Sequence, residues 1–219
     1  LVNAAGPGVL AVEGLLGDAP DYAMRLVRGS HIVVPGLFDH PYAYFFQLPD
    51  GRIFFAIPFQ RHFTLIGTTD RDCAPGDPIR ASEEEIAYLC EGASRYFARA
   101  VTPADVVWTY SGVRPLYDDG ASKAQEATRD YVLKLEGGDG QAPLINVFGG
   151  KITTARKLAE AALEKLAPFF PTMGAPWTDT GHLPGGNIPV AAVPAAIAEI
   201  RTRHPYLSER HAARLFRYY

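Results

Sequence analysis

The sequence lacks the features of disulfide-rich, metal-binding and membrane-spanning proteins. Its 219 residues include only two cysteines, Cys73 and Cys90, without CxxC or metal-ligand spacing, and the six His residues show no ligand spacing either. We therefore expect two reduced thiols and no metal site. No apolar run approaches the ~18 residues of a membrane span, and no signal peptide is visible. The formal net charge of −3 gives no reason to expect nucleic-acid binding. These absences favour an ordinary cytoplasmic globular protein.

From Arg25 to Asp70 the pattern of residues predicts β-structure. Pro49-Asp50-Gly51 separates two aromatic-rich runs and indicates a hairpin, because Asp-Gly tolerates the positive φ of a tight turn. Residues 1–25 are expected to form a short strand, a Gly-rich turn and a loop. The opening Leu1-Val2-Asn3, without an initiator Met, is interpreted as an entry in mid-domain. Strands are expected at 32–34, 42–48, 52–57, 63–66, 106–113, 131–135 and 144–148.

Helices are expected where the apolar residues recur with the spacing of one helical face. Ser82 and Glu85 have the spacing of a capping box, and one apolar helical face follows them. A second helix is expected from about 153 to 167, where Pro168 ends it. After the Pro- and Gly-rich stretch 171–189, two short helices are expected, one from near Pro194 and one capped by Ser208.

The predicted fold class is therefore α+β: a mixed, mostly antiparallel sheet with helices on one side, followed by a small all-helical C-terminal segment. Residues 1–170 are expected to form the sheet domain, residues 171–189 a linker, and residues 190–219 the start of a helical domain.

His31 follows Gly29 and Ser30 at the mouth of the apolar strand 32–34. An imidazole in such a place titrates near neutral pH and can move a proton to or from a hydroxyl. A hydrogen-bonded structural His is the alternative.

The segment Tyr110–Pro115 combines an arginine with an apolar strand pattern. The alternation places Tyr110, Gly112 and Arg114 on one face. A buried arginine requires an anion. That anion is either a protein carboxylate or a phosphate, which arginine binds with two donors. Arg129 stands beside Asp130 at the start of another strand, so an internal ion pair is the default for it; if Arg114 and Arg129 converge, they would make a site for a dianion.

The fourth segment runs from Phe148 through Gly149, Gly150 and Lys151 to Thr153. A strand ends, two glycines expose backbone N–H groups, and a helix begins. Such a helix start favours an anion or an electron-rich carbonyl, and Lys151 adds a positive charge beside it. The spacing is not that of a P-loop; an ordinary strand–helix turn is the alternative.

At these segments the sequence resembles a known family, the bacterial FAD-dependent glycerol-3-phosphate dehydrogenases. The matching segments keep their order over nearly the whole chain, which is more specific than any one motif. They are Val2–Pro7, Arg28–Pro35, Ile66–Asp70, Trp108–Leu116, Phe148–Lys151, Arg156–Glu160 and Leu183–Gly186.

The resemblance implies oxidation of the C2 hydroxyl of sn-glycerol 3-phosphate to dihydroxyacetone phosphate. It further implies hydride transfer to FAD, quinone as the electron acceptor, and peripheral contact with the inner membrane. By resemblance His31 is the candidate base and, with Arg114, catalytic, although an Arg-bound alkoxide is an alternative to a His base. Substrate binding is assigned to Arg129, Lys151 and Tyr110, and cofactor binding to Gly6, Gly112, Gly149, Gly150, Lys151 and Thr153.

Two features depart from the family pattern. Gly8 stands where the family usually has Trp, and no GxGxxG is present, so the pyrophosphate-binding segment is missing. We expect the chain to be a substrate-holding piece of a longer enzyme, with remnants of the FAD domain at about 1–10 and 144–168, and inactive alone. A glycerol-3-phosphate oxidase using oxygen and a non-catalytic binding module on the same scaffold remain alternatives.

Overall fold

The computed structural model describes residues 1–16, 22–120, 128–137 and 140–219. The chain divides into two compact units, Leu1–Pro171 and Thr172–Tyr219. Within the described residues no helix combines the length and apolar character needed to cross a membrane. Cys73 and Cys90 are free thiols, as the sequence predicted.

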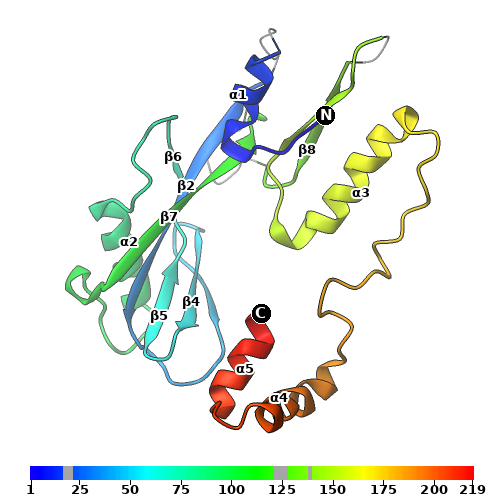
Figure 1. Cartoon of the computed structure of the whole chain (residues 1–219). Helices are drawn as coiled ribbons and strands as arrows, with labels where there is room; N and C mark the ends of the chain where they lie inside the picture. The colour runs from blue at the N-terminus through cyan, green and yellow to red at the C-terminus, as the bar shows by residue number, and fades with distance from the viewer. Residues whose placement is uncertain (17–21, 121–127, 138–139) are drawn as a thin grey trace. The chain divides into compact units, whose positions relative to one another are not determined.

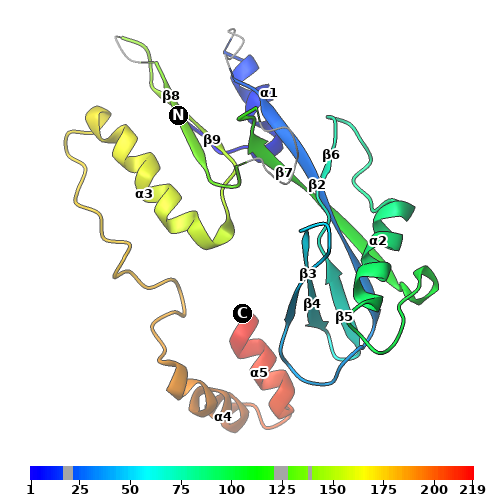
Figure 2. The same ribbon diagram turned by 180° about the vertical axis from the view of Figure 1, so that it is seen from behind.

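A six-stranded antiparallel sheet forms most of the first unit (Figure 1). Its central strand is β2 (Met24–Pro35), which pairs with β7 (Trp108–Tyr117) from Met24 to Val33; Figure 2 shows the two strands side by side. The opposite edge of β2 pairs first with β6 (Arg71–Asp72) and then with β5 (Phe63–Gly67). Strands β4 (Ile53–Phe59) and β3 (Tyr44–Gln47) continue the sheet beyond β5.

Helix α2 (Glu83–Ser94) covers one face of this sheet, and the main core lies between them. Because successive strand residues point to opposite faces, Ile32 and Val34 face the helix while His31 faces away. The predicted capping box of α2 is confirmed: Glu85 N donates to Ser82 Oγ, and Ser82 N donates back to the Glu85 carboxylate. Leu89, Cys90 and Ala93 of α2 pack with Ile32, Val34, Leu48, Phe54, Ile66 and Val101.

A smaller, three-stranded sheet has the order β1-β9-β8. β1 (Val2–Asn3) is parallel to β9 (Leu144–Phe148), and β8 (Val132–Glu136) is antiparallel to it. Helix α3 (Ala155–Leu166), flanked by the 3-10 turns η3 (Ile152–Thr154) and η4 (Ala167–Phe169), packs through Ala162 and Leu166 on Ile145.

One expectation about the first 25 residues is wrong. They contain the 3-10 turn η1 (Gly6–Gly8) and the short helix α1 (Val9–Gly14) where a loop was expected. Asn3, which lies in β1, contacts the start of this helix: its side-chain amide donates a hydrogen bond to the Val9 carbonyl at 2.9 Å. That contact joins residues that local sequence pattern does not connect.

The second unit contains the 3-10 turn η5 (Val190–Ala192) and the helices α4 (Val193–Arg203) and α5 (Glu209–Tyr218). Ser208 caps α5 as predicted, accepting a hydrogen bond from His211 N. The remaining 3-10 turn, η2 (Pro103–Asp105), precedes β7 in the first unit.

Candidate functional site

His31 and Tyr110 stand directly opposite each other on β2 and β7. Their rings are stacked, with centroids 4.7 Å apart and planes 3° from parallel. The imidazole lies across Gly67 of β5: a Cβ atom placed there would be 2.1 Å from His31 Cδ2. The sheet therefore holds the imidazole between an aromatic ring and a strand that has no side chain at this position.

This environment favours the neutral imidazole. Burial lowers the pKa of His31, and the positive charge of Arg114 lowers it further. Nδ1 of His31 is shielded from solvent and has no hydrogen-bond partner among the described residues. A neutral imidazole can accept a proton at neutral pH, and the shielding of Nδ1 assigns that role to Nε2.

Arg114 lies four residues after Tyr110 in β7, on the same face of the sheet, as the alternation predicted. Its guanidinium crosses β2 above Gly29, where an added Cβ would lie 2.3 Å from Nη1. Nη1 contacts Asp70 Oδ1 at 3.1 Å, and Nη2 donates to Thr68 Oγ1 at 3.2 Å. Of the two anions that the sequence left open for Arg114, the structure shows a protein carboxylate, that of Asp70.

Arg129 joins the same carboxylate, with Nη2 2.9 Å from Asp70 Oδ2. Its ion-pair partner is therefore not the neighbouring Asp130 that the sequence offered first. Two guanidinium groups now share one carboxylate, so the three side chains carry a net positive charge. Both arginines are about one-third exposed, at 33% and 37%. A second anion can approach this charge from solvent, and guanidinium groups bind phosphate with paired donors.

The turn after β9 needs glycine at both positions. Gly149 and Gly150 have φ of 67° and 94°, values that side chains disfavour. A Cβ on Gly149 would lie 3.1 Å from the Asp130 carbonyl, and one on Gly150 would lie 2.8 Å from Leu158. The turn therefore runs next to the residue that follows Arg129. Lys151 and Thr153 come directly after it and are exposed.

A second glycine turn follows β1. Gly6 has a φ of 56°, and a Cβ placed on it would meet nothing within 4 Å. Because β1 and β9 are parallel and paired through Asn3 and Asn146, their carboxyl ends meet at one edge of the small sheet. Ligands of sheets with parallel strands bind at such edges. Gly112 in the large sheet likewise has open space where a side chain would stand.

The structure brings together His31, Tyr110, Arg114 and Arg129 through contacts that join three strands and the residues between them. It places Gly149 beside the segment that carries Arg129. Sequence reasoning missed the part played by Asp70 and Thr68, which bind the arginines. The available signal was their position directly after a strand, in a Thr-Thr-Asp sequence. Among the described residues no group of three His, Cys, Asp or Glu side chains could hold a metal ion.

Comparison with known proteins decides the family. Residues 1–156 match the family model described as FAD dependent oxidoreductase. The chain belongs to this family. The glycerol-3-phosphate dehydrogenase of Pseudomonas aeruginosa is 45% identical over 100% of this chain and 43% of its own length. The aerobic glycerol-3-phosphate dehydrogenase of Escherichia coli K12 is 46% identical over 99% of this chain and 44% of its own length. The chain thus spans less than half the length of these relatives.

A solved structure of this family agrees over almost the whole chain. The glycerol-3-phosphate dehydrogenase of Bacillus halodurans, complexed with FAD, superposes with a TM-score of 0.77 at 27% identity. The match covers 98% of this chain and 41% of that one. The α+β arrangement expected from the sequence is therefore the arrangement of a known FAD-dependent oxidoreductase.

The residues described here fit one part of the FAD cofactor of this family. The glycine turns at Gly6 and Gly149–Gly150 are partly or fully exposed and carry no side chains, and Lys151 adds an exposed positive charge. Backbone N–H groups and positive charges stabilise an electron-rich ring. The pyrophosphate would require a Gly-rich strand–turn–helix, and this sequence contains no GxGxxG. The fit therefore concerns the flavin ring alone.

Proposed function

We propose that this chain is the substrate-binding part of a flavoenzyme that oxidises sn-glycerol 3-phosphate to dihydroxyacetone phosphate. The observation that carries the proposal is the pair Arg114 and Arg129 on one carboxylate, Asp70, beside a His31 whose pKa is lowered. The excess positive charge suits a phosphate dianion, and the neutral imidazole suits a hydroxyl that must lose its proton. A carboxylate substrate would need less positive charge than these residues supply.

In this reaction the C2 hydroxyl loses its proton and the C2 hydrogen leaves with its electron pair. FAD, when bound, supplies the two-electron acceptor for that hydride. His31 Nε2 takes the hydroxyl proton, because Nδ1 is shielded. Arg114 and Arg129 bind the phosphate, and Tyr110 holds the imidazole by stacking. The residues that would border the flavin ring are Gly6, Gly112, Gly149, Gly150, Lys151 and Thr153.

We further propose which domains of the longer enzyme the residue ranges of this chain belong to. Residues 1–170 carry the substrate sheet, with parts of the FAD domain at about 1–10 and 144–168. Residues 171–189 form a linker, and residues 190–219 begin a helical domain. Quinone would be the electron acceptor, with the enzyme on the cytoplasmic side and in peripheral contact with the inner membrane. By itself the chain binds FAD weakly, so it should emerge from gel filtration without stoichiometric flavin.

The test is the absorbance spectrum of the gene's full-length product before and after anaerobic addition of sn-glycerol 3-phosphate. We expect the flavin band to bleach, and Arg114→Ala to abolish bleaching at the same substrate concentration. Arg99→Ala is the matched control, since Arg99 forms an exposed surface pair with Asp105 and should bleach normally. Glycerol without phosphate should bleach the band poorly.

Each outcome has a definite meaning. A flavin band that sn-glycerol 3-phosphate leaves unchanged would keep the flavoprotein fold and reject the substrate. A protein without any flavin band would support a non-catalytic binding module on the same scaffold. Rapid reoxidation of the bleached flavin by oxygen, without quinone, would favour the oxidase over the dehydrogenase.

A further inference from the structure

The segment 68–70, which joins β5 to β6, forms a bulge against β2. His31 pairs with Gly67, but Arg28 pairs with Arg71. Gly29 and Ser30 therefore face Thr68, Thr69 and Asp70, one residue more than a regular ladder allows. Such an extra residue bends the strand and re-aims its side chains, and bulges of this kind occur next to active sites.

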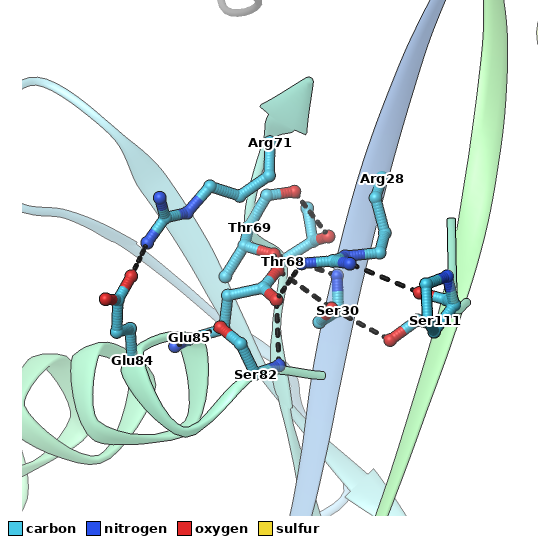
Figure 3. Close-up of polar contacts among 10 residues, drawn as sticks. Arg28, Ser30, Thr68, Thr69, Arg71, Ser82, Glu84, Glu85 and Ser111 are labelled. Carbon is cyan, nitrogen blue, oxygen red and sulfur yellow. Dashed lines mark hydrogen bonds and ion pairs between the residues drawn. The ribbon is translucent and has the colours of Figure 1, made fainter. Parts of the chain in front are cut away.

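The bulge sends its side chains to both faces of the sheet. Thr68 and Asp70 contact Arg114 on the face of the sheet opposite to α2. Thr69 points the other way and donates its hydroxyl to Glu85 Oε1 at 2.6 Å, under helix α2 (Figure 3). The middle residue of the bulge is thus held from the face opposite to the arginines.

Glu85 is the buried anchor of this arrangement, with a side chain only 1% exposed. Oε1 accepts from Thr69 and also from Ser30 Oγ at 2.9 Å; Oε2 accepts from Arg28 Nη2 at 2.8 Å and from Ser82 N at 3.0 Å. Burial alone would raise the pKa of Glu85, but these hydrogen bonds and the charge of Arg28 outweigh it and lower the pKa. The carboxylate is therefore ionised at neutral pH.

An ionised carboxylate only accepts hydrogen bonds, so it fixes the directions of the neighbouring hydroxyls. Ser30 Oγ donates to Glu85 and must accept from Ser111 Oγ, 2.8 Å away. Thr69 Oγ1 donates to Glu85 and accepts from Ser30 N at 2.9 Å. Thr69 N in turn donates to the Ser30 carbonyl at 3.3 Å. Glu85 thereby locks the bulge to β2 at the residue before His31.

We propose that Glu85, acting through Thr69, is a positioning residue for substrate phosphate: it holds the bulge in the one conformation that aims Thr68 and Asp70 at Arg114 and Arg129. The proposal rests on the proposed function, because it takes the two arginines as the phosphate site. Asp70 binds both arginines, so a shift of the bulge displaces both guanidinium groups together.

The decisive variants change one hydroxyl rather than the buried charge. Thr69→Val keeps the shape of the side chain and removes the link to Glu85, whereas Thr69→Ser keeps the link. Glu85→Gln is the companion variant, and Glu84→Gln is its matched control on the same helical turn. Glu84 pairs with the half-exposed Arg71, as Figure 3 shows, and its own side chain is 79% exposed.

Three quantities are measured on the gene's full-length product: the Kd of inorganic phosphate, and the KM and kcat of flavin reduction by sn-glycerol 3-phosphate. We expect Thr69→Val and Glu85→Gln to weaken phosphate binding and raise KM by about tenfold, the size of one lost charge-assisted hydrogen bond. The kcat should change less than KM. Thr69→Ser and Glu84→Gln should match the wild type.

The outcomes separate this inference from the proposed function. Wild-type phosphate affinity and KM in Thr69→Val would overturn the positioning role even if sn-glycerol 3-phosphate is oxidised. Weaker phosphate binding in Thr69→Val, with no flavin reduction in the wild type, would keep the positioning role and reject the substrate. An equal loss in Thr69→Ser would show that packing at residue 69 matters and the hydroxyl does not, which also overturns the inference.

Discussion

Gly29→Ala should separate anion binding from folding in this protein. Gly29 lies in the interior of β2 with ordinary strand backbone, so alanine meets no conformational obstacle there. A Cβ atom at this position would lie 2.3 Å from Nη1, 2.6 Å from Nη2 and 2.8 Å from Cζ of Arg114. Carbon and nitrogen atoms cannot approach so closely, and the guanidinium is the flexible partner. Arg114 must therefore move away from Asp70 and Thr68.

The expected magnitudes differ for stability and binding. Alanine in a strand interior gains about 0.5–1 kcal/mol over glycine in conformational entropy. Displacing Arg114, which is 33% exposed, loses an ion pair that solvent screens to about 0.2–1 kcal/mol. These terms nearly cancel in the free energy of unfolding. A charge-assisted bond from Arg114 to phosphate contributes about 1.5 kcal/mol at such exposure, which is about tenfold in Kd.

The measurements are urea unfolding and calorimetric titration with inorganic phosphate, both on the full-length product. Gly14→Ala is the control, because Gly14 is exposed in α1, outside the candidate site, and its added Cβ would meet nothing within 4 Å. It should leave phosphate affinity unchanged. If Gly29→Ala binds phosphate as tightly as Gly14→Ala does, Arg114 is not a phosphate ligand in the position described here.

Two further predictions concern protonation. Because the pKa of His31 is lowered by burial and by Arg114, kcat/KM should be full above about pH 6.5 and fall as the pH drops through the lowered pKa; a kcat/KM that rises toward acid would exclude His31 as the base. Glu13 and Glu136 both contact the single hydroxyl of Tyr22, which also accepts from Asn146 Nδ2 at 2.8 Å, so one carboxyl must carry a proton. Burial raises the pKa of Glu13, the hydrogen bond from Tyr22 lowers it, and Glu136 raises it again, so the net change is a rise. The folded state therefore binds more protons than the unfolded state, and the free energy of unfolding falls as the pH rises above about 4.5. At pH 7 the free energy of unfolding of Glu13→Gln, measured with urea, should therefore equal that of the wild type or exceed it by up to about 1 kcal/mol. A clear loss of stability in this variant at pH 7 would contradict a protonated Glu13.

Elements governed by local chemistry were predictable from sequence. The Asp50-Gly51 turn joins β3 and β4 with Gln47 opposite Ile53, and Gly51 has the expected positive φ of 81°. The Ser82–Glu85 box and the Ser208 cap start helices where the sequence placed them. In each case the deciding interaction joins residues a few positions apart.

The site could be predicted only in part, because its decisive contacts are long-range. Tyr110 and Arg114 share a face through strand alternation, which the sequence displays. The partner of Arg129 is Asp70, which no local rule selects over the adjacent Asp130. The bulge that presents Asp70 exists only through the register of β2 against two successive strands. Register is a property of the folded sheet and is invisible in a single segment.

The two faces of β2 make different contacts at this point of the fold. Ser30 faces helix α2 and bonds Glu85, while Gly29 and His31 on either side face the arginines and the aromatic ring. A shift of one residue would exchange these faces and bury His31 beneath the helix. Thr69 is held under α2 by its hydrogen bond to Glu85, opposite the face that carries the arginines. The same buried carboxylate thus caps α2 and, in our proposal, positions the segment that presents Asp70 to the two arginines.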